Sequence, residues 1–127
     1  MAEPNLVNVT SIYGRSFAYT LQTSLNSLVN CNVGKLIKIN TMMINNDQSS
    51  QTYYSSVALY IGGSTYWWIC YYLAIPPRST TTIIGKDNPI YLANQGNANS
   101  NGDKISAQCS TSNVCDIIIS YEIMDDA

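Results

Sequence analysis

The segment that decides the fold runs from Thr65 to Ile75 and reads Thr-Tyr-Trp-Trp-Ile-Cys-Tyr-Tyr-Leu-Ala-Ile, with both tryptophans of the chain and three of its ten tyrosines. Successive side chains of a β-strand point to opposite faces. Alternation therefore predicts one face with Tyr66, Trp68, Cys70, Tyr72 and Ala74, and another with Trp67, Ile69, Tyr71, Leu73 and Ile75. Neither face is polar, so we expect one face to enter a core and the other to be covered by more of the chain or by a partner.

Three interpretations of this aromatic strand stay open at this stage: core and subunit interface together, a sugar-binding face, or core alone. The first is favoured because tyrosine and tryptophan bury large areas and are enriched at protein interfaces. The predicted interface residues are Tyr53, Tyr54, Tyr66, Trp67, Trp68, Tyr71 and Tyr72. A sugar-binding face would use exposed rings such as those of Trp67 and Tyr71, which stack on pyranose surfaces.

Strands are predicted along most of the chain. The expected strands span residues 7–13 and 16–21 (a pair split by Gly14), 36–44, 57–61, 65–75, 80–84, 90–92, 105–109 and 115–124. Gly62-Gly63 predicts a hairpin before the aromatic strand, and Pro76-Pro77 ends that strand because proline cannot donate to the ladder. Residues 22–29 fit a short helix or a loop equally well. The sequence thus predicts a single all-β domain over residues 1–127, an antiparallel β-sandwich or jelly roll of about seven to nine strands.

The four cysteines lack the spacing of a metal site, and the chain contains no histidine. If Thr111-Ser112-Asn113 turns a hairpin, then Cys109 and Cys115 face each other across it. This register allows either a disulfide or two buried free thiols. The free thiols are favoured because the start of the chain is not a secretory signal, which indicates synthesis in a cytosol.

Composition limits the partners. Charged residues make up 11% of the chain and the net charge is −2, with neutral amides and hydroxyls as the polar groups. The six basic residues form no cluster, so nucleic-acid binding is not expected. No apolar run reaches the roughly 18–20 residues of a membrane span. A weakly charged surface suits dense assembly with like copies, so we expect a homo-oligomer.

Catalytic, cofactor and metal sites are not expected. Without histidine there is no Ser-His or Cys-His nucleophile. Asp116 and Glu122 share one face of a predicted strand and are interpreted as solvated residues on its outer side rather than as a glycosidase pair. Residues 97–103 resemble a calcium loop in oxygen spacing, but the twelfth position is Gln108, and a plain polar loop is favoured.

Several segments in order resemble a known group of proteins. They span Pro4 to Gly14, Gly34 to Asn40, Leu73 to Thr80, Pro89 to Leu92, and Ile118 to Glu122. Their order resembles small virion structural proteins of tailed phages, especially phages that infect cyanobacteria and other marine bacteria. The resemblance covers most of the chain and departs from the group in the aromatic middle and the Asn-rich loop.

This resemblance implies a β-rich, non-enzymatic subunit of the virion, assembled in the host cytoplasm, with no catalytic residues to carry over. It suggests a head decoration (cement) protein that associates as a trimer or dimer and whose partners are the major capsid protein or other virion proteins. The departures leave a tail or neck position open. A glycan-binding adhesion module is the alternative function.

Overall fold

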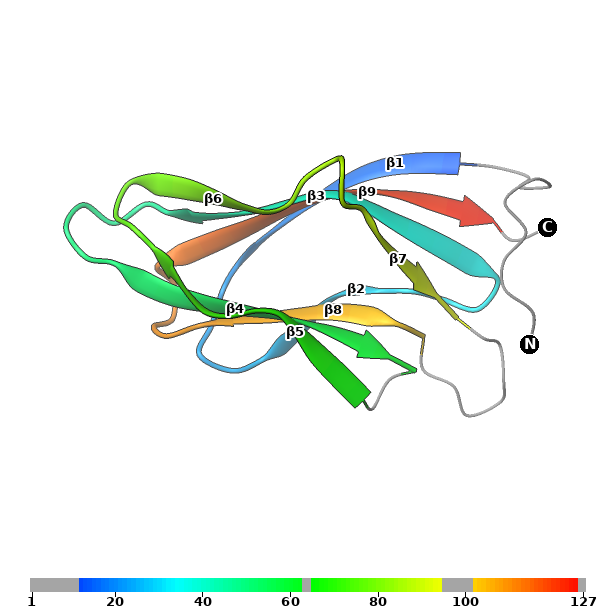
Figure 1. Cartoon of the computed structure of the whole chain (residues 1–127), viewed down its shortest axis with the longest axis horizontal. Helices are drawn as coiled ribbons and strands as arrows, with labels where there is room; N and C mark the ends of the chain where they lie inside the picture. Colours follow the sequence, from blue (N-terminus) through cyan, green and yellow to red (C-terminus); the bar gives the residue numbers. More distant parts are fainter. Residues whose placement is uncertain (1–11, 63–64, 95–101, 126–127) are drawn as a thin grey trace.

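The computed structural model describes residues 12–62, 65–94 and 102–125, and within these residues every regular element is a strand. The strands are β1 (Ile12–Thr20), β2 (Asn26–Asn30), β3 (Lys35–Asn46), β4 (Tyr53–Ile61), β5 (Thr65–Ile75), β6 (Ser79–Ile84), β7 (Ile90–Ala93), β8 (Lys104–Cys109) and β9 (Cys115–Asp125). Figure 1 shows them stacked as two layers. The predicted all-β sandwich is confirmed.

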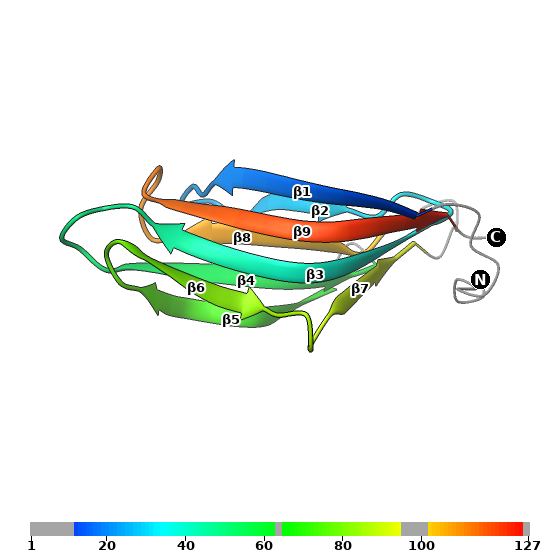
Figure 2. The ribbon, with the colours of Figure 1, turned by 90° about the horizontal axis from the view of Figure 1, so that it is seen from above.

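The two sheets have the strand order of a jelly roll. One sheet runs β1-β9-β3-β6, with β7 also paired to β3, and the other runs β2-β8-β4-β5. All of the pairings are antiparallel. Figure 2 shows β1, β9, β3 and β6 side by side across the first sheet. Consecutive strands therefore alternate between layers in several places, which closes one core between the sheets.

The core lies where the inward faces of the two sheets meet. Ile39, Met42 and Ile44 of β3 are fully buried, as are Ile117 and Ile119 of β9. The second sheet contributes buried residues of β4 and β8 to the same core, among them Val57, Ile105 and Ala107. Burying side chains of this size contributes about 1.5–3 kcal/mol each, so this two-layer contact provides most of the stability.

Three sequence predictions are corrected by the structure. Gly14 does not split a pair of strands, because it lies inside the continuous strand β1 opposite Glu122; residues 7–11 lie outside the described residues. Residues 22–29 contain no helix, and their second half forms β2, which directs Val29 into the core. The polar residues Asn26, Ser27 and Asn30 lie on this short edge strand, and Ser27 and Asn30 are exposed.

The predicted hairpin of residues 105–109 with 115–124 is wrong. β8 pairs with β2 and β4, whereas β9 pairs with β1 and β3, so the connection at Thr111-Ser112-Asn113 crosses from one sheet to the other. Asn113 adopts a positive φ of 66°, a conformation that asparagine tolerates better than most residues. The connection is as short as a hairpin loop, which is why the sequence alone could not separate the two arrangements.

Candidate functional site

Six aromatic rings contact one another in a continuous row along β4 and β5; we call this row the aromatic ladder. Its members, in order of contact, are Tyr60, Tyr66, Trp68, Tyr71, Tyr72 and Tyr54, with centroid separations of 5.2, 5.4, 4.8, 6.1 and 4.9 Å. Such spacings lie in the favourable range for aromatic pairs, which contribute about 0.5–1.5 kcal/mol each beyond area burial. The ladder therefore forms one organised surface rather than a set of scattered rings.

Two irregularities in β5 bring these rings to one face. The register runs from Ala58↔Trp68 to Val57↔Cys70 and then to Ser55↔Leu73, so β5 contains two more residues than the matching part of β4. Each extra residue is a β-bulge, which shifts the alternation by one position. The predicted strict alternation over the whole strand is thus wrong, and Tyr71 joins Trp68 instead of facing away from it.

The second bulge depends on Tyr72 and Ser56. Tyr72 has a positive φ of 57°, an uncommon and strained conformation for a bulky residue. Its backbone N–H donates to Ser56 Oγ at 2.8 Å, and its ring stacks on that of Tyr54 with an interplanar angle of 8°. One hydrogen bond and one stacked pair therefore hold the bulge in place.

The ladder lies on the outer face of the β2-β8-β4-β5 sheet. Val57 points into the core between the sheets, so its neighbours Ser56 and Ala58 point outward, yet they are only 2% and 0% exposed. A hollow lined by Tyr54, Ser56, Tyr72 and Gln108 confirms that these side chains share one side. The rings thus cover the small outward residues of β4 while their own outer surfaces meet solvent.

The rings of the ladder keep a large exposed area. Exposed fractions are 38% for Tyr54, 45% for Tyr66, 37% for Trp68, 65% for Tyr71 and 58% for Tyr72. With about 200 Å² for each ring, roughly 500 Å² of aromatic surface remains in contact with solvent. That area is comparable with the largest apolar patch found on a typical monomer, and patches of this kind often mark interaction sites.

The structure places the predicted interface residues in three positions. Tyr54, Tyr66, Trp68, Tyr71 and Tyr72 belong to the ladder. Trp67 pairs with Leu59, which packs against the core, so Trp67 lies on the opposite face of β5 from the ladder but stays exposed at the rim. Tyr53 pairs with buried Ile75 and packs against the core, which separates it from the surface formed by the others.

Tyr60 is the member of the ladder that the sequence analysis missed. It lies opposite Tyr66 across the β4–β5 turn, and the amino group of Lys104 lies 4.7 Å above its ring centroid. The sequence held part of this signal: the glycine pair marks a turn, and the pairing of Ile61 with Thr65 after it sets Tyr60 against Tyr66. Among the contacts of the described residues, that of Lys104 with Tyr60 is the one that brings a positively charged side chain onto a ring of the ladder.

The predicted cysteine pair meets between the sheets instead of across a hairpin. Cys109 and Cys115 are free, buried, and hydrogen-bonded to each other at the two ends of the β8–β9 connection. The shared hydrogen bond lowers the pKa of Cys109 and raises the pKa of Cys115. Both residues are buried, and Cys109 also lines the hollow beside Tyr54 and Tyr72.

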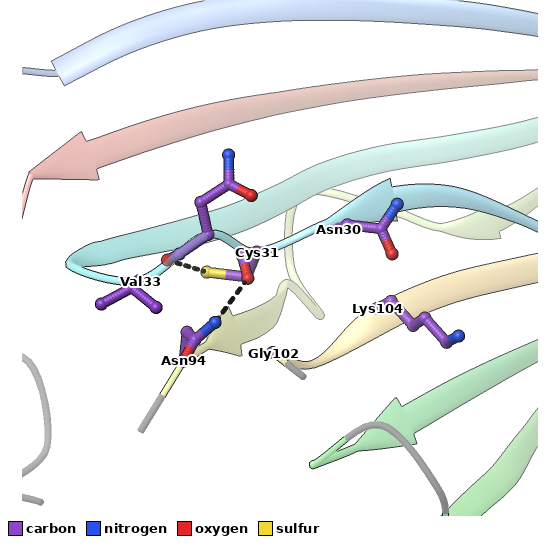
Figure 3. A pocket seen from close by; sticks show the side chains of 7 residues that line it. Asn30, Cys31, Val33, Asn94, Gly102 and Lys104 are labelled. Carbon is purple, nitrogen blue, oxygen red and sulfur yellow. Dashed lines mark hydrogen bonds between the residues drawn. The ribbon is translucent and has the colours of Figure 1, made fainter. Parts of the chain in front are cut away.

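A second hollow lies near the ends of β2 and β7 and is lined by Asn30, Cys31, Val33, Asn94, Gly102 and Lys104 (Figure 3). Its volume is about 330 Å³. The Asn94 amide donates to the Cys31 carbonyl oxygen at 3.0 Å, and the Cys31 thiol donates to the Lys35 carbonyl oxygen at 3.2 Å. These polar groups bond to one another, so they tie the chain together here instead of presenting a ligand set.

Catalytic and metal chemistry find little support in the described ranges. Asp116 and Glu122 lie on the outer side of β9, where Asp116 accepts a hydrogen bond from Thr20 at 2.8 Å. Six residues of strand separate them by roughly 20 Å, too far to act on one glycosidic bond. Among the described residues no group of three or more histidine, cysteine or acidic side chains could hold a metal ion. Most of the calcium-like stretch, residues 97–101, lies outside those residues.

Comparisons with known proteins show the fold. No protein-family model matches the chain, and no curated protein matches it. A solved structure titled "Bacillus endospore appendages form a novel family of disulfide-linked pili" aligns with a TM-score of 0.53 at 9% identity, covering 99% of this chain and 96% of the other. A structure titled "Structure of infectious bursal disease virus Gx strain" aligns with a TM-score of 0.40 at 8% identity, covering 91% of this chain and 37% of the other.

The described part of the chain contains no helix long and apolar enough to cross a bilayer.

Proposed function

We propose that this chain is a non-enzymatic structural subunit of a tailed-phage virion, a head decoration protein that binds the major capsid protein through its aromatic ladder. The observation behind the proposal is the ladder itself, an ordered, solvent-facing row of rings on the outer face of a sheet. An isolated soluble domain gains nothing from exposing roughly 500 Å² of aromatic surface. A subunit that docks on a neighbour does, because tyrosine and tryptophan dominate the energetics of protein interfaces.

The fold and the sequence add two independent supports. The fold is shared, over nearly the whole length of both chains, with a protein whose title describes pili, which are built by repeating subunits. The ordered segments that resemble small phage virion proteins suggest the particle. The low content of charged residues, 11%, limits repulsion between copies packed closely on a surface.

The direct test is mass spectrometry of gradient-purified phage particles. We expect peptides of this chain in a fixed ratio to the major capsid protein, at tens of copies or more per particle. A second arm adds purified chain to particles that lack it and compares Trp68→Ser with Tyr91→Ser, which removes an exposed ring outside the ladder. Trp68→Ser is expected to lose most of the binding and Tyr91→Ser to retain it. Absence of the chain from particles contradicts the proposal.

The alternative function, glycan binding, is favoured by one feature. The hollow beside Tyr54 and Tyr72, with a volume of about 130 Å³, is also lined by the polar residues Ser56 and Gln108, and sugar sites combine rings with such groups. However, the Tyr54 and Tyr72 rings stack on each other, which leaves one face fewer on each for a pyranose. A titration with host polysaccharide, in which the fluorescence of the two tryptophans is recorded, distinguishes glycan binding from assembly. A saturable change would favour the glycan, and a flat response favours assembly.

A further inference from the structure

The free edge of β5 is the second unusual feature of this surface. Within the described residues β5 pairs only with β4, so its outer edge carries backbone N–H and C=O groups without a strand partner. Proteins usually block such edges with charged side chains, prolines or very short strands. β5 has 11 residues, and none of them is charged or a proline. Its two bulges protect only the half from Ile69 onward.

The other edge strands are better protected. β1 contains Arg15 and Gly14. β2 is 5 residues long and its exposed positions are polar. β6 and β7 are 6 and 4 residues long. The regular half of β5, residues 65–68, therefore stands out as the segment ready to accept another strand. Figure 1 shows this half of β5 at the margin of the lower layer, directed away from the first sheet.

We propose that residues 66–68 of β5 pair antiparallel with the same residues of a second copy, joining two four-stranded sheets into one of eight strands. This pairing deepens the proposed structural role, on which it rests. A two-fold axis at Trp67 sets Trp67 against its own copy and Tyr66 against Trp68 of the second copy. Side-chain parity is preserved in this register, so the two aromatic ladders continue across the junction as one surface.

The occupant is a second copy because self-pairing suits this strand. Around a two-fold axis identical residues approach each other, so a charge near the axis would meet a like charge. Residues 65–75 carry no charge. Instead, aromatic residues face one another, and cross-strand aromatic pairs contribute about 0.2–1 kcal/mol each.

The size of the contact sets its strength. The exposed parts of Tyr66, Trp67 and Trp68 provide roughly 300 Å² per copy, or roughly 600 Å² for both, which is below the area of a standard interface. We therefore expect a weak dimer, with a dissociation constant on the order of 10–100 µM. Neighbouring copies on one particle would raise the local concentration above that value.

Sedimentation velocity of the purified chain up to about 1 mM tests the pairing. The wild type should pass from monomer to dimer as the concentration rises. Thr65→Lys and Trp67→Lys each bring a like charge from both copies to the junction, so both variants should stay monomeric. Tyr91→Lys puts the same charge on an exposed ring of β7 and should dimerise as the wild type does. Circular dichroism must show that each variant is folded. If Trp67→Lys does not fold, Thr65→Lys, which changes an exposed position, still tests the pairing.

Hydrogen exchange distinguishes edge pairing from stacking of two ladder faces. Amides of residues 66–68 should slow as the concentration rises through the dimer range, because edge pairing protects backbone groups. A wild type that is monomeric at about 1 mM, or a dimer whose β5 amides exchange at the monomer rate, overturns the pairing. Neither result contradicts the proposed virion role, because the particle measurement tests that role and does not depend on dimerisation in solution.

Discussion

Tyr54 and Tyr72 stack nearly parallel, with ring centroids 4.9 Å apart, although Tyr72 occupies a strained backbone position with a φ of 57°. The stacking and the hydrogen bond from the Tyr72 N–H to Ser56 stabilise a bulge that a regular strand would not form. Because this bulge carries Tyr71 and Tyr72 to the outer face, the surface depends on a few local contacts. These contacts can be removed one at a time.

Replacing Ser56 with alanine removes the acceptor of the Tyr72 N–H. We expect Ser56→Ala to lower the free energy of unfolding by about 1 kcal/mol and to reduce ladder-dependent binding, because Tyr72 is no longer held. Urea unfolding measures the first effect. Ser16→Ala is the matched control, since Ser16 and Ser120 form an exposed pair at 3.3 Å; its cost should stay within about 0.5 kcal/mol. Equal costs for the two variants would contradict this account of the bulge.

Asn46 connects the end of β3 to the end of β5. It is fully buried; its amide donates to the carbonyl oxygens of Gln51 and Ile75, at 2.8 and 2.9 Å, and its own oxygen accepts from Gln48. Asn46→Ala leaves these groups without a partner and should cost about 3 kcal/mol. Thermal and urea unfolding measure the loss. Asn45→Ala, which removes an exposed bond to Thr80, should cost under about 1 kcal/mol, and a comparable loss there would refute the distinction.

Gly102 is required by close packing. A Cβ at this position would lie 2.0 Å from the Cys31 carbonyl oxygen and 2.9 Å from the Asn94 amide nitrogen. Gly102→Ala is therefore expected to destabilise the fold by at least about 2 kcal/mol, because backbone must move. A Cβ at Gly14 would meet nothing within 4 Å, so Gly14→Ala should be neutral or slightly stabilising. Melting temperatures of the two variants give the comparison, and a tolerated Gly102→Ala would argue against this packing.

Cys31 predicts a pH dependence. Burial, with a smaller contribution from the charge of Asp103, raises the pKa of Cys31 from 9.0 to about 11. Since the folded-state pKa is above the unfolded value, the protonated thiol contributes fully below pH 9, and the contribution is lost as the pH rises through about 11. We expect the wild type to lose about 2 kcal/mol more than Cys31→Ala does between about pH 8 and 11. Urea unfolding of both proteins at each pH measures this, and parallel profiles would contradict it.

Local patterns predicted most of the fold. Alternation in residues 57–61 and the Gly62-Gly63 turn defined the β4–β5 hairpin, and Pro76-Pro77 ended β5 where the structure ends it. Long-range pairing was the weaker part. Residues 110–114 are as short as a hairpin loop, so nothing local distinguished a hairpin from a crossing between sheets. Leu21, Leu25 and Leu28 have helical spacing, but pairing of Asn26–Asn30 with β8 overrides that local preference.

The candidate site was predicted in composition but not in geometry. Five of the predicted interface residues lie in the ladder, because an aromatic strand this rich could not be buried on both faces. Tyr53 faces the core and Trp67 lies at the rim, because the register between β4 and β5 decides which face of the sheet each side chain takes. The second bulge could not be predicted, because it arises from the contact of Tyr72 with Ser56 and Tyr54 and not from any residue of β5 alone.

The central claim is that a neighbouring protein covers the aromatic ladder in the assembled particle. Hydroxyl-radical footprinting with peptide-level mass spectrometry, on the isolated chain and on intact virions, tests it most directly. The account predicts that Tyr66, Trp68, Tyr71 and Tyr72 are labelled readily in the isolated chain and are strongly protected in the virion. Equal labelling of these rings in both samples would contradict it.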